Sequence, residues 1–311
     1  MKADIHQRVR SCQECAFAKP SANTKLGKLV SEKPTRPLEK IYFDYMGPMV
    51  RSKSGNRFLL VCVDASSKYV WFAPTRNSTS QTTIKELTRI FQCFGFPKFL
   101  ASDNARAFTC PLFRNFVFNF GMTHIKTSPY HPQGNLAERV NRNLKSALIA
   151  FHSKSQTSWD QNLAWLQIAF NAAKHESHQH SPFDIMFAFQ PGHPLSLLWS
   201  IDDILPDSLD KVTPNWRNIR DQLCKANERS GIRYNKGRSD SNFKVDDLVL
   251  VKSFMLSNKA KKFMAKLAPR WIGPYQIKSF VSPVSVSLFD PTSGKFVRTA
   301  HVSQLKPFSC K

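Results

Sequence analysis

The order of apolar runs between residues 41 and 127 restricts the fold more than any other feature of the sequence. Three short runs come first, at 41–46, 57–64 and 68–73, with a tight turn at 64–67. Helices are then expected at 78–94 and 111–120, and short strands at 97–102 and 123–127. Three antiparallel strands followed by alternating helices and strands predict an α/β fold, in which helices cover a mixed five-stranded sheet.

The remainder of the chain predicts helices and then a small β-domain. Two long helices are expected at about 136–151 and 159–174, a Pro-broken region at 175–210, and a basic helix at 214–234. Short strands at 248–251, 275–280, 285–289 and 296–301 are typical of a small barrel. His175, His178 and His180 are interpreted as a solvated connector, with metal binding as the alternative. The aromatics Phe113, Phe116, Phe118 and Phe120 are interpreted as core residues, with base stacking as the alternative.

The charge of the chain favours a polyanionic partner. The 311 residues include 45 Lys and Arg against 22 Asp and Glu, a formal net charge of +23. Nucleic acid is therefore a better candidate than a membrane surface. Without an apolar signal core or a run of 18 apolar residues, the sequence predicts a soluble intracellular protein.

The seven cysteines contain one notable pair, Cys12 and Cys15. A CxxC pair can provide half of a tetrahedral zinc site, and the other half would be a His pair or a second CxxC. His6 is the sole upstream candidate for a His ligand. Two free thiols are the alternative, consistent with a reducing compartment.

Three acids in different elements are candidate metal ligands. Asp44 lies inside an apolar run, Asp103 ends another, and Glu138 lies early in the helix expected from 136. Taken singly, Asp44 is interpreted as a carboxylate at a strand end, Asp103 as a turn or N-cap residue, and Glu138 as a solvated helix position. Together they could hold two Mg²⁺ ions about 4 Å apart, an arrangement that supports in-line phosphoryl displacement.

Two cations follow Glu138 on the same expected helix face. Arg142 and Lys145 stand at i+4 and i+7, where they could hold phosphates beside the acids without reading sequence. Asp64 is a rival acid, but its Asp-Ala-Ser-Ser context predicts a turn, so its role is interpreted as structural.

Several motifs together resemble the integrases of gypsy-type LTR retrotransposons and, more distantly, retroviral integrases of the D,D,E superfamily. They are the stretches IYFDYMGP at 41–48, SDN at 102–104 with Phe108, YHPQGN at 130–135, ERVNR at 138–142, Trp159 with FN at 170–171 and SPF at 181–183, and WIGPY at 271–275. The last is similar to the family's GPY/F module.

The resemblance implies an RNase H-like catalytic core and a C-terminal SH3-like β-barrel. It implies two Mg²⁺ or Mn²⁺ ions on Asp44, Asp103 and Glu138, with 3′-end trimming of element DNA and joining to target DNA. It places further residues near double-stranded DNA: Tyr130, Gln133, Asn135, Asn141, Arg142 and Lys145. In the barrel, Lys252, Lys266, Arg270 and Arg298 could follow DNA phosphates, a solvated basic surface being the alternative. A homo-oligomer acting in the nucleus is expected.

The same resemblance sets the expected domains. These are a remnant of a zinc-binding module at 1–37, the catalytic core with its helical extension at 38–195, a linker and basic helix at 196–242, and a DNA-binding barrel at 243–311.

The sequence departs from the family pattern at several points. The zinc-binding His pair is missing, Ala105 stands where Gly is common, 34 residues separate Asp103 from Glu138 (one fewer than usual), and no chromodomain tail follows the barrel. A truncated or domesticated copy is therefore expected. The rival functions are a DNA- or chromatin-binding protein without turnover and a stand-alone RNase H-type nuclease.

Overall fold

The computed structural model describes residues 12–19, 27, 36–126, 136–152, 155–187, 216–239, 243–255, 257 and 264–308. The chain divides into two compact units. The larger contains Glu32–Thr127 and His131–Arg229, and the smaller contains Met1–Ser31, Ser128–Tyr130 and Ser230–Lys311. No helix within the described ranges is long and apolar enough to cross a membrane.

The larger unit is built on the predicted mixed five-stranded sheet. Its strands are β1 (Lys40–Met46), β2 (Phe58–Asp64), β3 (Val70–Thr75), β4 (Phe99–Ser102) and β5 (Thr123–Lys126), in the order β3-β2-β1-β4-β5. The strands β1, β2 and β3 pair antiparallel, whereas β4 runs parallel to both β1 and β5. The central strand β1 therefore has an antiparallel neighbour on one side and a parallel neighbour on the other.

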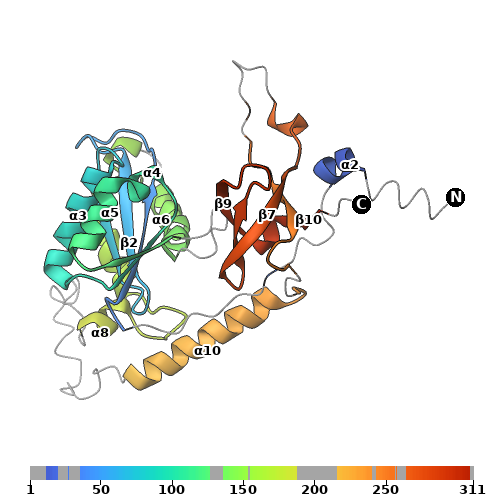
Figure 1. Cartoon of the computed structure of the whole chain (residues 1–311). Coiled ribbons are helices and arrows are strands. Elements are labelled where there is room, and N and C mark those ends of the chain that lie inside the picture. Colours follow the sequence, from blue (N-terminus) through green and yellow to red (C-terminus); the bar gives the residue numbers. More distant parts are fainter. Residues whose placement is uncertain are drawn as a thin grey trace, which may run out of the picture. The chain divides into compact units, whose positions relative to one another are not determined.

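Helices cover both faces of this sheet (Figure 1). One face packs against α3 (Ser80–Phe94), α4 (Arg106–Thr109), α5 (Pro111–Asn119) and α8 (Pro182–Phe187), and the other against α6 (Leu136–His152) and α7 (Leu163–Ala172). Side chains alternate between the two faces along β1: Phe43 packs in the first core and Tyr42 in the second. Asp44 therefore faces α6.

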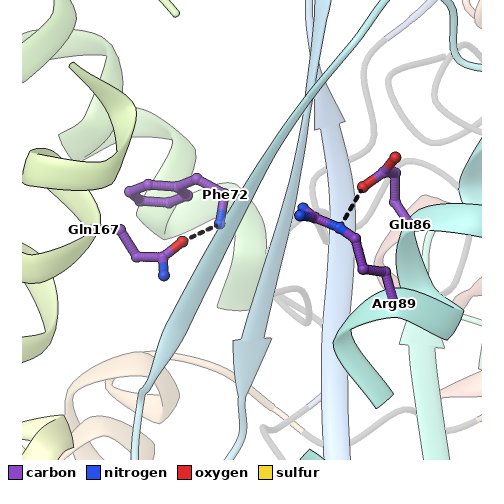
Figure 2. A network of polar contacts seen from close by, with 4 residues as sticks. All are labelled: Phe72, Glu86, Arg89 and Gln167. Atoms are coloured by element: carbon purple, nitrogen blue, oxygen red, sulfur yellow. Dashed lines mark hydrogen bonds and ion pairs between the residues drawn. The ribbon is translucent and has the colours of Figure 1, made fainter. Parts of the chain in front are cut away.

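Helix α7 protects the edge strand β3 with two side-chain amides. The amide N–H of Val70 donates to Asn171 Oδ1 at 2.8 Å, and Asn171 Nδ2 donates back to the Val70 carbonyl at 3.0 Å. The N–H of Phe72 donates to Gln167 Oε1 at 2.8 Å (Figure 2). Backbone groups that would otherwise remain open at a sheet edge are thus satisfied within the unit.

Some sequence predictions for this unit were wrong. The helix expected from 159 begins at Leu163, after the 3₁₀ turn η2 (Gln156–Ser158), and the short helices α4 and α8 were not predicted. The aromatics of α5 were expected in the core, yet Phe118 is 83% exposed, because it points away from the helix face that buries Phe113 and Phe116.

The histidine-rich run is a solvated connector only in part, because His175 is exposed whereas His178 is not. His178 is fully buried, and its Nε2 lies 3.2 Å from the carbonyl oxygen of Ser67 in the turn after β2. Burial lowers the pKa of His178 to about 3, so the neutral ring packs there at physiological pH. Asp64 fixes the same turn by accepting hydrogen bonds from Ser67 N and Oγ, in agreement with its structural interpretation.

The smaller unit contains a second five-stranded sheet, antiparallel throughout, which agrees with the predicted SH3-like barrel. Its strands are β6 (Leu248–Lys252), β7 (Trp271–Ser282), β8 (Ser285–Phe289), β9 (Phe296–His301) and β10 (Leu305–Pro307), in the order β10-β6-β7-β8-β9. The strand β10 was not predicted, and β7 begins four residues earlier than expected. The register shift beside Val249 accommodates Gly273, where an added Cβ would lie 3.0 Å from the Val249 carbonyl oxygen.

The short helix α2 (Gln13–Ala18) packs within this smaller unit. The rings of Phe17 and Phe308 lie 6.4 Å apart, and Trp271 Nε1 donates to the Lys19 carbonyl at 2.9 Å. Lys306 Nζ donates to the Ala16 carbonyl at 2.7 Å. The remaining elements are η5 (Ala265–Leu267), η6 (Val302–Gln304) and the 20-residue helix α10 (Trp216–Asn235), whose range crosses the division between the units.

The edge contacts of β3 give the first prediction. Asn171→Ala would leave two buried backbone groups of Val70 unpaired, so the free energy of unfolding should fall by about 2–3 kcal/mol. Urea unfolding and amide hydrogen exchange at Val70 would measure the loss. Arg89→Gln is the control, because it removes only the 3.1 Å ion pair with Glu86 from a largely exposed side chain (Figure 2), and should change stability by less than about 0.5 kcal/mol. Unchanged exchange at Val70 would contradict the role of Asn171.

Candidate active site

Asp44 is held between the central strand and a helix. Its Oδ1 accepts a hydrogen bond from the amide of Tyr45 at 2.8 Å, and its Oδ2 accepts one from Asn141 Nδ2 of α6 at 3.0 Å. The carboxylate is therefore oriented toward α6 by one backbone and one side-chain donor.

Asp103 directly follows β4, the parallel neighbour of β1. Tyr42 pairs with Ala101, so continuing this register by two residues brings Asp103 alongside Asp44. Asp103 is exposed, and its Oδ1 accepts a hydrogen bond from the Ala105 amide at 3.0 Å. Ala105 has φ −57°, which any residue adopts, so this backbone does not require the Gly common in the family pattern.

A contact that the sequence did not predict supports the end of β4. Ser102 Oγ donates to the Asp103 carbonyl at 2.8 Å and lies 2.8 Å from Nε2 of His124 on β5. Burial lowers the pKa of His124 to about 4, so the ring is neutral at physiological pH. This arrangement fixes the backbone on which Asp103 stands.

Glu138 lies in the first turn of α6 and is half-buried. The helix buries Ala137, Leu144 and Leu148 against the sheet, while Arg142 and Lys145 are exposed. Helical spacing places Glu138, Asn141, Arg142 and Lys145 on one flank beside the buried stripe. The common face predicted for Glu138 and the two cations agrees with this placement.

Electrostatics links the three acids. The pKa of Asp44 is raised to about 6, chiefly because burial disfavours its charged form, and next because of the negative charge of Asp103. Glu138 raises this pKa as well, whereas the hydrogen bonds from Tyr45 and Asn141 lower it. Three carboxylates from β1, the end of β4 and α6 thus act on one another.

The chemistry of these donors fits a hard divalent cation. Carboxylate oxygens are the ligands that Mg²⁺ and Mn²⁺ prefer. The side-chain oxygen of Asn141 is buried, and no residue in the described part of the chain donates a hydrogen bond to it. Among the described residues, however, no group of three or more His, Cys, Asp or Glu side chains is gathered closely enough to hold a metal. Coordination by all three acids would therefore require them to move closer together.

The remaining residues expected near DNA fall into two groups. Tyr130, Gln133 and Asn135 lie outside the described residues, as does the side chain of Lys266 in η5. In the smaller unit, Lys252 and Arg270 are both exposed at neighbouring strand ends, where Ser253 N donates to the Arg270 carbonyl at 2.8 Å.

Arg298 joins this part of the barrel. Its Nη2 donates to the Lys252 carbonyl at 3.0 Å, and both Lys252 Nζ and Arg298 Cζ lie within 6 Å of the Phe254 ring centre. Lys252 and Arg298 therefore form a basic cluster beside Phe254, and Arg270 lies at the neighbouring strand end.

Cys12 and Cys15 stand at the start and in the middle of α2, and both are free thiols. The pKa of Cys12 is lowered by hydrogen bonding to Cys15. Within the described ranges no third or fourth ligand accompanies the pair. The zinc site therefore stays a prediction.

Sequence reasoning placed Asn141 beside DNA and missed its bond to Asp44. Its i+3 spacing from Glu138 was the available signal, because residues three apart share a helix face. The Ser102–His124 contact had no comparable signal, since it joins two strands that are distant in sequence.

The raised pKa of Asp44 gives a stability prediction with a definite sign. Because the folded pKa of about 6 exceeds the ordinary 3.8, folding favours the protonated acid, and the charged form lowers stability as pH rises through 6. The neutral variant Asp44→Asn should therefore raise the free energy of unfolding at pH 7.5 by about 1–3 kcal/mol. This gain should vanish below pH 4. Urea unfolding at both pH values measures it, and a less stable variant at pH 7.5 would contradict the prediction.

Comparison with known proteins is consistent with this geometry. Residues 34–132 match the integrase core domain, and residues 243–308 match a domain of unknown function (DUF8803). The chain is 26% identical over 308 residues to the Pro-Pol polyprotein of simian foamy virus type 3, covering 98% of this chain and 25% of the relative. It is 27% identical over 315 residues to the Transposon Tf2-3 polyprotein of Schizosaccharomyces pombe, covering 99% of this chain and 23% of the relative.

The chain thus spans about a quarter of the length of these curated relatives. Its fold resembles a chain of the simian T-cell lymphotropic virus intasome in complex with the PP2A regulatory subunit B56 gamma. The TM-score is 0.62 at 16% identity, and the alignment covers 100% of this chain and 92% of the other. Residues 34–132 thus match the integrase core domain, the fold resembles that of an intasome chain, and over almost its whole length the chain resembles polyproteins of a retrovirus and of a retrotransposon.

Proposed function

We propose that this chain is a metal-dependent polynucleotidyl transferase that trims the 3′ ends of its element's DNA and joins them to target DNA. The observation that supports this most strongly is the 3.0 Å hydrogen bond from Asn141 to Asp44, because it ties the helix of Glu138 to the strand beside Asp103. Three acids from three elements are thereby brought to the same end of the sheet.

The two proposed reactions are the same displacement with different nucleophiles. In trimming, a water oxygen forms a bond to a phosphorus near the element's end while the P–O3′ bond breaks, which leaves a 3′-hydroxyl on the element. In joining, that hydroxyl oxygen attacks a target phosphorus, and the target's own 3′-oxygen departs and takes up a proton. Joining exchanges one phosphodiester for another, whereas trimming converts one phosphodiester into a 5′-phosphomonoester on the released nucleotides. In both steps the nucleophile attacks phosphorus directly, so the site need only position groups and stabilise charge.

Asp44, Asp103 and Glu138 would hold the divalent ions. When bound, Mg²⁺ or Mn²⁺ would lower the pKa of the attacking water or hydroxyl and neutralise charge on the leaving oxygen. The protein's own contribution is orientation: Asn141 and the Tyr45 amide hold the Asp44 carboxylate, and the Ser102–His124 contact holds the backbone at Asp103.

The proposed partner is double-stranded DNA. Arg142 and Lys145 are exposed on the flank of α6 that carries Glu138, so they can contact phosphates without reading sequence. The basic cluster beside Phe254 would provide a further backbone contact in the smaller unit. We further propose that the chain acts as a homo-oligomer in the nucleus.

The reaction itself provides the direct test. Purified chain, Mn²⁺ and a labelled duplex with the terminal sequence of its own element should give trimmed and joined products. Asp103→Asn/Glu138→Gln should reduce both products at least about 100-fold, because two of the three acids become neutral amides. Glu86→Gln is the matched control, since this acid lies on α3 and pairs with Arg89. Equal product from wild type and the double variant would refute the enzymatic function.

Metal binding can be tested without turnover. Mg²⁺ or Mn²⁺ should raise the melting temperature of the wild type, because a ligand that binds only the folded state stabilises it. The rise should be absent in Asp44→Asn and unchanged in Glu86→Gln, and EDTA should reverse it. An equal rise in Asp44→Asn would place the bound ion elsewhere.

A second function, DNA binding without turnover, is favoured by one observation. The three acids are not gathered closely enough to hold a metal within the described structure. Under this alternative the chain would bind duplex DNA with a steep salt dependence, but neither Mg²⁺ nor Mn²⁺ would alter its melting temperature.

A further inference from the structure

We propose that Arg51, Arg57 and Arg76 form a pocket in the larger unit that holds a backbone phosphate of double-stranded DNA. The pocket has a volume of about 380 Å³, and its lining also includes Met49, Val50 and Gly55. The choice of DNA as the source of the phosphate rests on the proposed function. The pocket itself rests on the geometry of the loop at 47–57.

This loop joins β1 to β2, and the chain that follows α6 fixes its shape. Trp159 Nε1 donates to the Val50 carbonyl at 2.9 Å. Asp160 Oδ2 accepts from the buried Ser52 Oγ at 2.6 Å and from Asn56 Nδ2 at 2.8 Å. These contacts hold the backbone on both sides of Arg51, so the pocket is preorganised.

The three arginines converge although they come from different strand ends. Arg57 N donates to the Thr75 carbonyl at 2.9 Å, which places Arg57 and Arg76 on neighbouring strands. A Cβ added to Gly55 would lie 3.5 Å from Arg76 Nε and 3.8 Å from Arg51 Nη2. Two guanidinium groups therefore approach the same point above Gly55.

Within the described part of the chain, none of these guanidinium groups makes an ion pair or a side-chain hydrogen bond. The nearby Asp160 carboxylate is engaged by Ser52 and Asn56 instead. The three side chains are exposed, so solvent weakens the repulsion between their charges without removing it, and a bound anion would lower it further. Guanidinium groups match the oxygens of a phosphate with two parallel hydrogen bonds, which favours a phosphate over a halide.

The position of the pocket favours a phosphate that belongs to a nucleic-acid strand. Met49 and Val50 also line a second cavity of about 560 Å³, which contains Lys145 of α6. The two hollows therefore adjoin at Met49 and Val50, and the second one reaches the helix that carries Glu138. A DNA backbone that crossed both hollows would place phosphates near Arg51 and near Lys145.

Gly55 offers a matched pair of variants. Gly55→Asp would place a carboxylate between the guanidinium groups and occupy the site of the phosphate, whereas Gly55→Asn has the same shape without the charge. Both carry the same backbone strain, because Gly55 has φ +88°. Binding of a labelled duplex to the full chain in EDTA should be about tenfold weaker for the Asp variant than for the Asn variant. The slope of log affinity against log salt should also be smaller in magnitude by about one.

A second pair guards against misfolding at Gly55. Arg51→Gln/Arg76→Gln should reduce affinity and salt slope in the same direction, and Arg51→Lys/Arg76→Lys should restore most of the slope, because Lys retains the charge. Arg114→Gln on α5 should leave the slope unchanged, since it removes an exposed arginine outside the pocket. Melting curves would confirm that each variant is folded.

Equal slopes for Gly55→Asp and Gly55→Asn, together with a wild-type slope in the Gln pair, would overturn the proposal. Replacing chloride with inorganic phosphate at equal ionic strength distinguishes the sources. If this exchange raised the melting temperature of Gly55→Asn but not of Gly55→Asp, while the two variants bound the duplex equally, the pocket would bind free phosphate rather than DNA. Since binding is measured without metal, failure of the trimming assay would leave this result intact, and the two proposals can fail separately.

Discussion

The hydrogen bond between Asn141 and Asp44 is the contact on which the candidate site depends. It works because β1 is the central strand, so alternate residues face opposite cores and Asp44 faces α6. Burial of Leu144 and Leu148 presses α6 onto that face and fixes its rotation. Glu138, three residues before Asn141, is then held at the same end of the sheet as Asp44.

This arrangement costs stability. Burial and the neighbouring acids raise the pKa of Asp44, so its charged form opposes folding at neutral pH. The rest of the larger unit offsets that cost through two apolar cores. The side-chain amides of Asn171 and Gln167 on α7 add hydrogen bonds to the backbone of the edge strand β3. A site whose negative charges repel one another is suited to binding a cation. The positive charges of the arginines around Gly55 likewise repel one another, so that pocket is suited to binding an anion.

Local patterns predicted much of the fold. Helix α3 follows the predicted spacing from its Thr79 cap to Gly95, and the five strands of the first sheet were expected in nearly the observed places. Short elements were missed because four to six residues carry little periodicity, as with α4 and α8. His178 was misjudged because its burial depends on a turn more than 100 residues earlier, and Phe118 because an aromatic residue does not reveal which side of its helix is covered.

The sequence alone determined the element order, the excess of positive charge and the identity of the three candidate acids, because these follow from local spacing and composition. The tertiary structure alone decided which groups meet. The Asn141–Asp44 bond, the Ser102–His124 contact and the arginines around Gly55 join segments whose separation in sequence carries no periodic signal. Such contacts arise when packed cores fix strand register and helix rotation, and both are set by the whole fold rather than by any one segment.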